Sequence, residues 1–397
     1  MKYDLIVIGG GAAGFFAALT AKAKNPKASI AVLEKTALLL SKVRISGGGR
    51  CNVTHSCFEP KALCLNYPRG SKELVGPFHR FQPKDTIEWF ESRGVLLKTE
   101  EDGRMFPITN RSQTIIDCLL SEAKQLGVEI LLKQRVETIV KEENGFKILS
   151  KEGHLYQCSS LILASGSSTE GHEWAESFGH TIIPPVPSLF TFNVPTSPLK
   201  ELSGLSWNPV ELKISGTSHI HEGPLLITHF GFSGPAALKL SAWGARTLFE
   251  REYRVDLIIN WLPHLSQEDI FDKLFHLKKA FPYKILLAEN IFGFPKNLWK
   301  AFACEKRLND LSSKELHQLA EKLHADLYQV DGKTTHKEEF VTCGGVSLSE
   351  VDFKTMQSKV CPGLFFAGEI LDIDGITGGF NFQNAWTTGY TAGSSCF

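Results

Sequence analysis

Apolar runs alternate with stretches of helical spacing from the first residues of the chain. Residues 3–8 (YDLIVI) are a compact apolar run, which is typical of a strand buried in a parallel sheet. Phe15, Leu19 and Lys24 continue a helical pattern, and residues 29–33 (SIAVL) predict a second strand. The order strand, helix, strand predicts a βαβ unit at the start of the chain.

The same alternation predicts further strands on either side of a middle segment. Apolar runs predict strands over 128–132, 135–140, 161–166 and 361–369, followed by a helix over about 382–392. The cluster Pro184-Pro185-Val186-Pro187 predicts a domain crossing, because proline fixes φ and ends regular pairing. Beyond the prolines we expect strands over 190–194, 210–215, 218–220, 225–229 and 253–260.

Helical spacing dominates residues 265–326. This stretch holds ten Lys or Arg against nine Asp or Glu, so its sum does not indicate a simple basic face. Its apolar side chains predict a core stripe rather than a ligand site, and they are Phe271, Leu274, Phe275, Leu277 and Phe281.

Composition excludes several classes of protein. The 397 residues are enough for two or three domains, and 43 basic residues balance 43 acidic ones, so no overall charge favours nucleic acid or an anionic membrane. The nine cysteines form no C-x-x-C pair, which argues against a flavin disulfide reductase and indicates reduced thiols in a cytoplasmic protein. We expect no signal peptide, no membrane span and no metal site.

A glycine fingerprint directly follows the first predicted strand. Gly9, Gly11 and Gly14 satisfy G-x-G-x-x-G, and Glu34 ends the second strand twenty residues after Gly14. Gly9 permits the tight turn, Gly11 lets the backbone approach a pyrophosphate, and Gly14 lets the helix pack closely on the strand. The Glu34 carboxylate is suited to accept hydrogen bonds from ribose hydroxyls and disfavours a 2′-phosphate. The pattern predicts a dinucleotide site.

Two other segments favour FAD over NAD in this site. Residues 46–52 (SGGGRCN) form a second glycine-rich loop, flanked by Arg44 and Arg50, that can approach another part of a long cofactor. Gly378 and Gly379 precede the C-terminal helix, whose N-terminal dipole can stabilise negative charge on a reduced flavin. Because no second complete fingerprint appears, the sequence predicts no separate Rossmann domain for NAD(P)H.

The chain resembles the BaiN-type flavoproteins, which are FAD-dependent oxidoreductases distantly related to the succinate dehydrogenase and fumarate reductase flavoproteins. The matching stretches span nearly the whole chain and read VIGGGAAG at 7–14, SGGGRCNVT at 46–54, GRMFP at 103–107, THFGFSGPA at 228–236 and GLFFAGEILDIDGITGGFNFQNAWTTGYTAG at 363–393. The resemblance implies an α/β fold with a discontinuous Rossmann-like FAD-binding domain. That domain would comprise 1–190 and 341–397, and an inserted β-barrel plus helical substrate domain would occupy 191–340.

The resemblance also implies which residues bind FAD. The adenosine and pyrophosphate end would meet Gly9, Gly11, Ala13, Gly14 and Glu34, with Val136 at the adenine. The flavin half would meet Gly48, Arg50 and Asn52, and it would be closed over by Gly368, Glu369, Asp374, Gly379, Phe380 and Asn381. The expected set is completed by Lys35, Ser46, Gly47, Ala164 and Gly166. One departure is the segment 167–172, which is shorter than usual in the family, so contacts of that loop do not carry over.

Substrate and reductant are less specified by the sequence. His229 lies in a loop rich in glycine and is the best candidate for proton handling, against a structural role bonded to backbone. Arg50 and Arg104 can hold an anionic substrate or pair with a cofactor or carboxylate. The preferred hypothesis is a reductase of a carbon–carbon double bond driven by NADH or NADPH, acting on uridine in ribosomal RNA or on a small unsaturated metabolite. An oxidase of a small amine such as aminoacetone, and a flavin-bearing binding module without turnover, are the alternatives.

Overall fold

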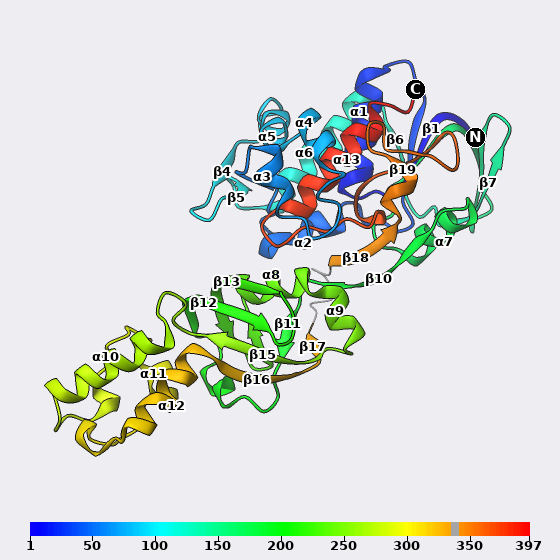
Figure 1. The fold of residues 1–397 in the computed structure, drawn as a ribbon. Coiled ribbons are helices and arrows are strands. Elements are labelled where there is room, and N and C mark those ends of the chain that lie inside the picture. Colours follow the sequence, from blue (N-terminus) through cyan, green and yellow to red (C-terminus); the bar gives the residue numbers. More distant parts are fainter. Residues whose placement is uncertain (335–340) are drawn as a thin grey trace. The chain divides into compact units, whose positions relative to one another are not determined.

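The chain forms two compact units, each with its own core. A computed structural model describes residues 1–334 and 341–397 (Figure 1). Unit 1 comprises Met1–Val186 and Lys337–Phe397, and unit 2 comprises Pro187–His336. The predicted end of the insert at residue 340 lies outside the described residues. Among the residues that are described, every helix is too short or too polar to cross a bilayer.

Unit 1 is built on a nine-stranded sheet with a parallel centre. Its five parallel strands lie in the order β21 (Leu364–Phe366), β9 (Leu155–Leu163), β1 (Lys2–Ile8), β2 (Ile30–Leu33) and β6 (Glu129–Leu131). The residues of β2 and the last four of β1 are all buried, as expected where helices cover both faces of a parallel sheet. A strand from the C-terminal segment therefore completes a sheet begun by the first residues, which confirms the predicted discontinuous Rossmann-type fold.

Antiparallel strands extend this sheet at β9 and at the β21 edge. These additions are β7 (Val136–Glu142), β8 (Gly145–Ser150), β19 (Val351–Asp352) and β20 (Gln357–Ser358). A small three-stranded sheet contains β3 (Thr54–His55), β5 (Arg104–Pro107) and β4 (Leu97–Thr99). The remaining elements of unit 1 are α2 (Ser41–Gly49), α3 (Pro60–Cys64), α4 (Val75–Arg80), α5 (Pro83–Glu91), α6 (Ser112–Leu126), α7 (Thr169–Ser177), β10 (Ile182–Ser188), β18 (Val341–Val346), the short helix Leu348–Glu350 and η5 (Gly368–Ile370).

The first and last helices of the chain pack against each other. In Figure 1, α1 (Ala12–Lys24) and α13 (Phe380–Gly393) lie side by side. A Cβ atom on Gly389 would lie 2.6 Å from the carbonyl oxygen of Ala13, and one on Gly393 would collide with the carbonyl oxygen of Ala17. Because these two glycines lack a side chain, α13 can approach the backbone of α1 directly.

Unit 2 contains a barrel-like antiparallel sheet. Its strand order is β16 (Asp326–Asp331), β15 (Arg254–Asn260), β12 (Ser206–Ile214), β13 (Ile220–Ile227), β14 (Gly231–Ser233), β11 (Thr191–Asn193) and β17 (Lys333–Thr334). The two end strands are consecutive in the chain and only Gly332 separates them, so the path returns on itself. The other elements of unit 2 are α8 (Pro235–Trp243), α9 (Ala245–Glu250), α10 (Gln267–Ala280), α11 (Lys296–Phe302), α12 (Ser313–His324) and short 3₁₀ turns at Pro198–Leu202, Leu286–Ala288 and Leu308–Asp310.

One hydrophobic core joins the barrel-like sheet of unit 2 to its helices. Leu274 and Leu277 of α10 are buried in this core, and Phe271 and Phe275 pack against it, as the predicted stripe requires. Phe281 is the exception, since 45% of it is exposed. The prediction was wrong for this residue because α10 ends at Ala280, so the next side chain leaves the buried face of the helix.

Two expected breaks in strand pairing are absent from the structure. The strands expected over 218–220 and 225–229 are one strand, β13, which passes through Gly223 and Pro224. A Cβ atom on Gly223 would lie 3.7 Å from the backbone nitrogen of Ala236 in α8, an ordinary contact, so the feature that favours glycine here is its φ of 153° within the strand. The prolines at 184–187 do lie at the division between the two units, as expected. They do not end strand pairing, because β10 forms a two-stranded sheet with β18 and its other edge needs no N–H donors.

The close approach of α13 to α1 predicts that adding one methyl group to Gly393 destabilises unit 1. Alanine favours a helix over glycine by about 0.5–1 kcal/mol, but here its Cβ collides with the Ala17 carbonyl, so we expect Gly393→Ala to cost about 1–3 kcal/mol. Thermal unfolding measures the difference. Gly76→Ala in α4 is the matched control, because its Cβ meets no atom within 4 Å, and we expect it to be neutral or stabilising. Equal melting of Gly393→Ala and the parent protein would contradict the packing.

His221 on β13 predicts a pH dependence of unit 2. Burial beside the Trp243 ring, aided by the charge of Lys239, lowers the pKa of His221 from 6.5 to about 4. As the pH falls below 6.5, His221 becomes protonated in the unfolded chain but stays neutral in the folded protein. The free energy of unfolding therefore decreases until the pH reaches about 4. For a partly exposed ring we expect about 1–2 kcal/mol between pH 7 and 5. Denaturant unfolding should show that His221→Phe loses less stability between pH 7 and 5 than the variant His264→Gln, whose site is exposed. An identical loss of stability in the two variants would refute the assignment.

Candidate functional site

The first glycine loop joins the end of β1 to the start of α1. Gly9 has a φ of 113°, and a Cβ there would collide with the carbonyl oxygen of Ala164 in the neighbouring strand connection. A Cβ on Gly14 would collide with the carbonyl oxygen of Gly9. In contrast, a Cβ on Gly11 would meet no atom within 4 Å. Two glycines are thus required by packing, and Gly11 borders open space at the N-terminus of α1.

Glu34 lies beside this loop, at the end of β2. Its carboxylate accepts hydrogen bonds from the backbone N–H of Gly10 at 2.9 Å and from the N–H and hydroxyl of Thr36 at 2.8 Å. These three donors hold the side chain in one orientation next to the glycines. Oε1 accepts both bonds from Thr36, while Oε2 accepts only the Gly10 N–H and keeps capacity for a further hydrogen bond. The arrangement suits recognition of a sugar hydroxyl at the loop.

The second glycine loop interrupts the end of α2. Gly47, Gly48 and Gly49 have φ angles of 58°, 67° and 82°, all in the left-handed region, and Ser46 just before them is extended. A Cβ on Gly47 would lie 2.9 Å from the ring of Phe106, whereas Gly48 and Gly49 border open space. Successive N–H groups in such a conformation can approach an anion or a ring without side chains in the way.

The two arginines considered for an anionic substrate are already paired. Arg50 donates to Glu100 at 2.7 Å and lies over the Phe106 ring, with 4.0 Å from its central carbon to the ring centroid. Arg104 donates to the same Glu100 at 3.2 Å and to Asp102 at 2.7 Å. The sequence left several roles open for these two arginines, and in the structure both pair with carboxylates.

Asn52 links the second glycine loop to the start of α13. In the amide orientation that satisfies both of its ends, Asn52 accepts from the Gly379 N–H at 3.0 Å and donates to the Thr54 carbonyl at 3.1 Å. Gly379 has a φ of 95°, and a Cβ there would lie 2.6 Å from the Thr54 carbonyl oxygen. The N-terminus of the last helix is therefore fastened to a loop more than three hundred residues earlier.

The C-terminal segment also contacts the first glycine loop. A Cβ on Gly368, whose φ is 76°, would lie 2.7 Å from the Cβ of Ala13, and the Gly368 N–H donates to Thr388 of α13 at 2.9 Å. Next to it, Glu369 pairs with Lys42 of α2 and accepts from the Thr342 N–H at 3.2 Å. The structure thus brings together residues from both predicted halves of the FAD-binding set.

Asp374, Phe380 and Asn381 are held by protein partners within unit 1. Asp374 is fully buried and forms a two-pronged pair with Arg69. The Phe380 carbonyl accepts from the Tyr67 hydroxyl at 2.6 Å, and Asn381 makes two 2.9 Å bonds to the backbone of Gly375. These bonds fix the residues around the N-terminus of α13, and their contact with the flavin stays a prediction.

Three further predicted residues lie near Glu34, Gly9 or Glu369, and the side chain of a fourth points toward Glu170. Val136 begins β7, two residues after Gln134, whose N–H donates to the Glu34 carbonyl at 2.9 Å. Ala164 contacts Gly9, and a Cβ on Gly166 would lie 3.7 Å from the Glu369 carboxylate. Lys35 points instead to Glu170 at 3.4 Å, with half of its side chain exposed.

His229 belongs to unit 2, in the turn between β13 and β14. Thr228 closes this turn, since its N–H donates to the Gly231 carbonyl at 2.8 Å, and the His229 side chain is exposed. The predicted cofactor-binding residues all belong to unit 1. A catalytic role for His229 therefore stays a prediction.

A His–Glu–Ser arrangement elsewhere in unit 1 superficially resembles a hydrolase triad. His180 lies 3.1 Å from Glu350 and 2.7 Å from the hydroxyl of Ser358. However, that hydroxyl accepts from the N–H groups of Val360 at 3.0 Å and Cys361 at 2.7 Å, and both Ser358 and His180 are buried. Burial lowers the pKa of His180, so the neutral ring serves as a structural hydrogen-bonding group.

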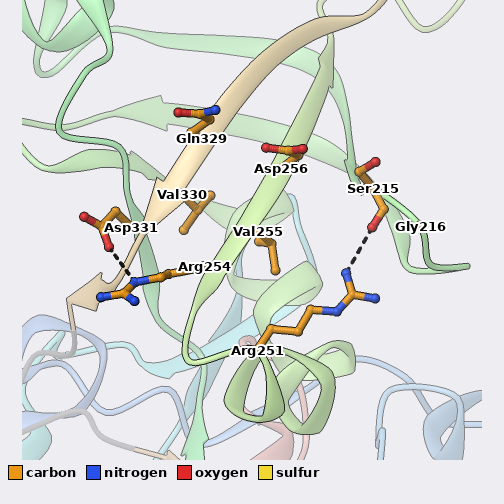
Figure 2. Close-up of a pocket in the computed structure, with 9 residues that line it drawn as sticks. All are labelled: Ser215, Gly216, Arg251, Arg254, Val255, Asp256, Gln329, Val330 and Asp331. Carbon is orange, nitrogen blue, oxygen red and sulfur yellow. Dashed lines mark hydrogen bonds and ion pairs between the residues drawn. The ribbon is translucent and has the colours of Figure 1, made fainter.

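Figure 2 shows a hollow whose lining residues all belong to unit 2. It has a volume of about 620 Å³ and is bordered by β15, β16 and the start of the loop after β12. Within it, Arg254 donates to Asp331 at 3.3 Å and Arg251 donates to the Ser215 carbonyl at 3.2 Å. None of the predicted site residues lines it, so it is not the predicted flavin site.

Some residues that position the site were not singled out from the sequence. Lys42, Arg69 and Thr388 hold Glu369, Asp374 and Gly368, respectively. The sequence separation is 327 residues for the first pair and 305 for the second, so no local spacing rule could reveal them. Only the closure of the discontinuous unit creates these contacts.

Comparison with known proteins agrees with this geometry. Residues 3–395 match the family described as HI0933-like protein Rossmann domain. The chain is 30% identical to the ribosomal RNA dihydrouridine synthase of Escherichia coli, covering 98% of this chain and 96% of that protein. It is 28% identical to the 3-dehydro-bile acid delta(4,6)-reductase of Clostridium scindens, with 98% and 97% covered.

Solved structures show the same fold at low sequence identity. The 3-ketosteroid-delta4-(5alpha)-dehydrogenase of Rhodococcus jostii gives a TM-score of 0.54 at 14% identity, covering the whole of this chain and 96% of that one. The quinol fumarate reductase of E. coli gives 0.53 at 14%, covering the whole of this chain and 70% of that one. With a family match over residues 3–395, this chain belongs to the HI0933-like Rossmann-domain family and is an FAD-dependent oxidoreductase.

Proposed function

We propose that this protein is a cytoplasmic reductase that uses FAD and a reduced nicotinamide nucleotide to saturate a carbon–carbon double bond, and that its substrate is a uridine in ribosomal RNA. The observation that carries the proposal is the end-to-end similarity to the E. coli ribosomal RNA dihydrouridine synthase. The relative from Haemophilus influenzae with the same name is also 30% identical, over 98% of this chain.

The second kind of relative supports the same reaction class. The protein from C. scindens is named a reductase of a dehydro-bile acid, and it too matches nearly the whole chain. Reduction of a ring double bond is common to both names, although the substrates differ greatly in size and charge. The reaction class is therefore better supported than the choice between RNA and a small unsaturated metabolite.

The residues of unit 1 fit FAD. Open space lies where Cβ atoms on Gly11, Gly48 and Gly49 would point, which is the cradle that a long cofactor needs. The N-cap residues of α1 and α13 are glycines without a capping side chain. Apart from the Gly379 N–H, which Asn52 accepts, the N–H groups of both first turns are therefore available to a ligand. When bound, FAD would supply the hydride chemistry, because no protein side chain can carry a hydride in this way.

The chain's own groups would bind and orient the reactants. The N-terminus of α1 would hold the pyrophosphate by aligned N–H groups, and Glu34 would accept from the ribose hydroxyls. The N-terminus of α13 at Gly379 would stabilise negative charge on the flavin ring through its dipole. His229 is the proposed proton donor to the substrate carbon, since its exposed ring can exchange protons with solvent.

Anaerobic reduction of the purified flavoprotein tests the reaction class. We expect NADH or NADPH to bleach the flavin absorbance rapidly, and addition of ribosomal RNA lacking dihydrouridine to restore it. Mass spectrometry of the recovered RNA should show the gain of two hydrogens on one uridine. The matched control is RNA in which the modification is already present, which should not restore the absorbance.

Other outcomes separate the alternatives. Bleaching without reoxidation by RNA, but with reoxidation by a small unsaturated acceptor, would move the substrate to the metabolite class. No bleaching by either nucleotide, with FAD confirmed and with reduction by a small amine such as aminoacetone, would indicate an oxidase. A flavin that none of these compounds reduces would indicate a binding module.

A substitution at Gly11 tests the placement of FAD. Gly11→Val adds a side chain in open space, so unit 1 should fold, but the side chain would occupy the position proposed for the pyrophosphate. We expect loss of FAD from the purified variant with little change in secondary structure. Gly9→Val is less informative because its Cβ collides with Ala164 and would disturb the fold itself.

The control for this prediction is the same change at Gly76, where a Cβ also meets open space but in α4. Gly76→Val should retain a full complement of FAD, measured by flavin absorbance against protein concentration. A Gly11→Val protein that carries as much FAD as this control would show that the first glycine loop is not the pyrophosphate site.

A further inference from the structure

The balanced charge of the helical part of unit 2 conceals a separation of charges. Residues 273–309 contain eight Lys or Arg and only two Glu. The flanking residues 265–272 and 310–326 contain seven Asp or Glu and only two Lys. The sum over the whole stretch is therefore near zero, while its middle is strongly basic. A basic segment is a condition for contact with phosphates.

The fold brings two parts of this basic segment side by side. Ile285 and Arg307 form an antiparallel bridge. The N–H of Leu308 donates to the Lys284 carbonyl at 2.8 Å, and the N–H of Leu286 donates to the Lys306 carbonyl at 3.0 Å. Lys284, Lys306 and Arg307 thus lie on adjacent backbone segments, and all three side chains are exposed.

Exposed apolar residues interrupt the basic ones at this bridge. Tyr283 is 80% exposed, Phe281 is 45% exposed and Ile285 is 43% exposed. Phe281 was expected in the core, but it lies at the surface with the Lys284 ammonium 4.5 Å from its ring centroid. Exposed aromatic rings beside lysines and arginines are the arrangement on which unpaired bases stack while the cations meet the phosphates.

The local acidic partners do not neutralise this surface strongly. Lys284 pairs with Glu289 at 2.9 Å and Lys306 with Glu315 at 2.7 Å, in both cases with half or more of the lysine side chain exposed. Exposed pairs of this kind contribute little free energy, so a phosphate can replace the carboxylate at small cost. Among the residues that the structure describes, none forms an ion pair with Arg307 within 4.0 Å.

We propose that the surface formed by Phe281, Tyr283, Lys284, Lys306 and Arg307 binds single-stranded RNA. In this assignment the Tyr283 ring stacks on a base, and the lysines and Arg307 contact the phosphates on either side of it. Single-stranded rather than duplex RNA fits, because stacking needs a base that is not already paired. The inference deepens the proposed function and rests on its RNA substrate.

The test uses full-length, FAD-loaded protein and a fluorescently labelled oligouridylate, followed by anisotropy over a range of salt concentrations. The charge variant is the double substitution Lys284→Glu and Arg307→Glu, and the matched control is Lys124→Glu with Lys151→Glu, two exposed lysines of unit 1. We expect the charge variant to weaken binding by roughly tenfold or more and to reduce the salt slope by about 1.4, the value for two lost contacts to a single strand. The control pair should bind as the parent does.

Tyr283 supplies a separate test of stacking. Tyr283→Ala should weaken binding by roughly 5- to 100-fold, whereas Tyr283→Phe, which keeps the ring, should bind within about twofold of the parent. Flavin content and the rate of flavin reduction should be unchanged in every variant, because none of these residues belongs to the predicted cofactor site.

The outcomes separate this inference from the proposed function. If the parent protein reduces uridine in ribosomal RNA but the variants bind the oligouridylate equally well, the surface is wrong and the function stands. If NADH or NADPH reduces the flavin of the parent protein but the protein binds no RNA at any salt concentration, both the RNA substrate and the RNA-binding surface are refuted. Binding of anionic lipid vesicles in place of RNA, lost in the same variants, would replace RNA by a membrane surface.

Discussion

The structure of unit 1 depends on how closely its last helix can approach its first one. Gly389 and Gly393 place the backbone of α13 against the carbonyls of Ala13 and Ala17, a separation that any side chain at either position would prevent. The packing joins the two ends of the chain, which also share the sheet through β21 and β9. Dense packing of this kind tolerates small changes in volume poorly.

The same approach assembles the candidate cofactor site almost entirely from backbone. Gly368 contacts Ala13, and Gly379 is held by Asn52, so the C-terminal segment contacts both glycine loops. Side chains such as Arg69 and Tyr67 support the site indirectly, because they hydrogen-bond to Asp374 and to the Phe380 carbonyl. A site made of helix N-termini and bare glycines binds through N–H groups and dipoles, which suits an anionic dinucleotide and leaves its chemistry to the cofactor.

In unit 2 the feature for which we propose a function is a surface rather than a site built from backbone. The core of this unit takes the apolar faces of α10 and α12 and leaves Phe281, Tyr283 and the neighbouring lysines outside it. Single exposed rings are common on protein surfaces; here it is the gathering of rings beside basic side chains that indicates a contact with nucleic acid. Family membership fixes the flavin chemistry; discrimination between an RNA and a small substrate has to come from surfaces of this kind.

The sequence by itself determined the βαβ unit and the glycine fingerprint with Glu34, because each depends on residues close together in the chain. Tertiary structure alone decided that Gly223 lies within a strand, that Phe281 is exposed, and that Arg50 and Arg104 share Glu100. It also decided the pairing of Arg69 with Asp374 and of Lys42 with Glu369. Local spacing encodes turns and helix faces, but contacts between residues three hundred positions apart exist only once the two ends of the chain have packed together.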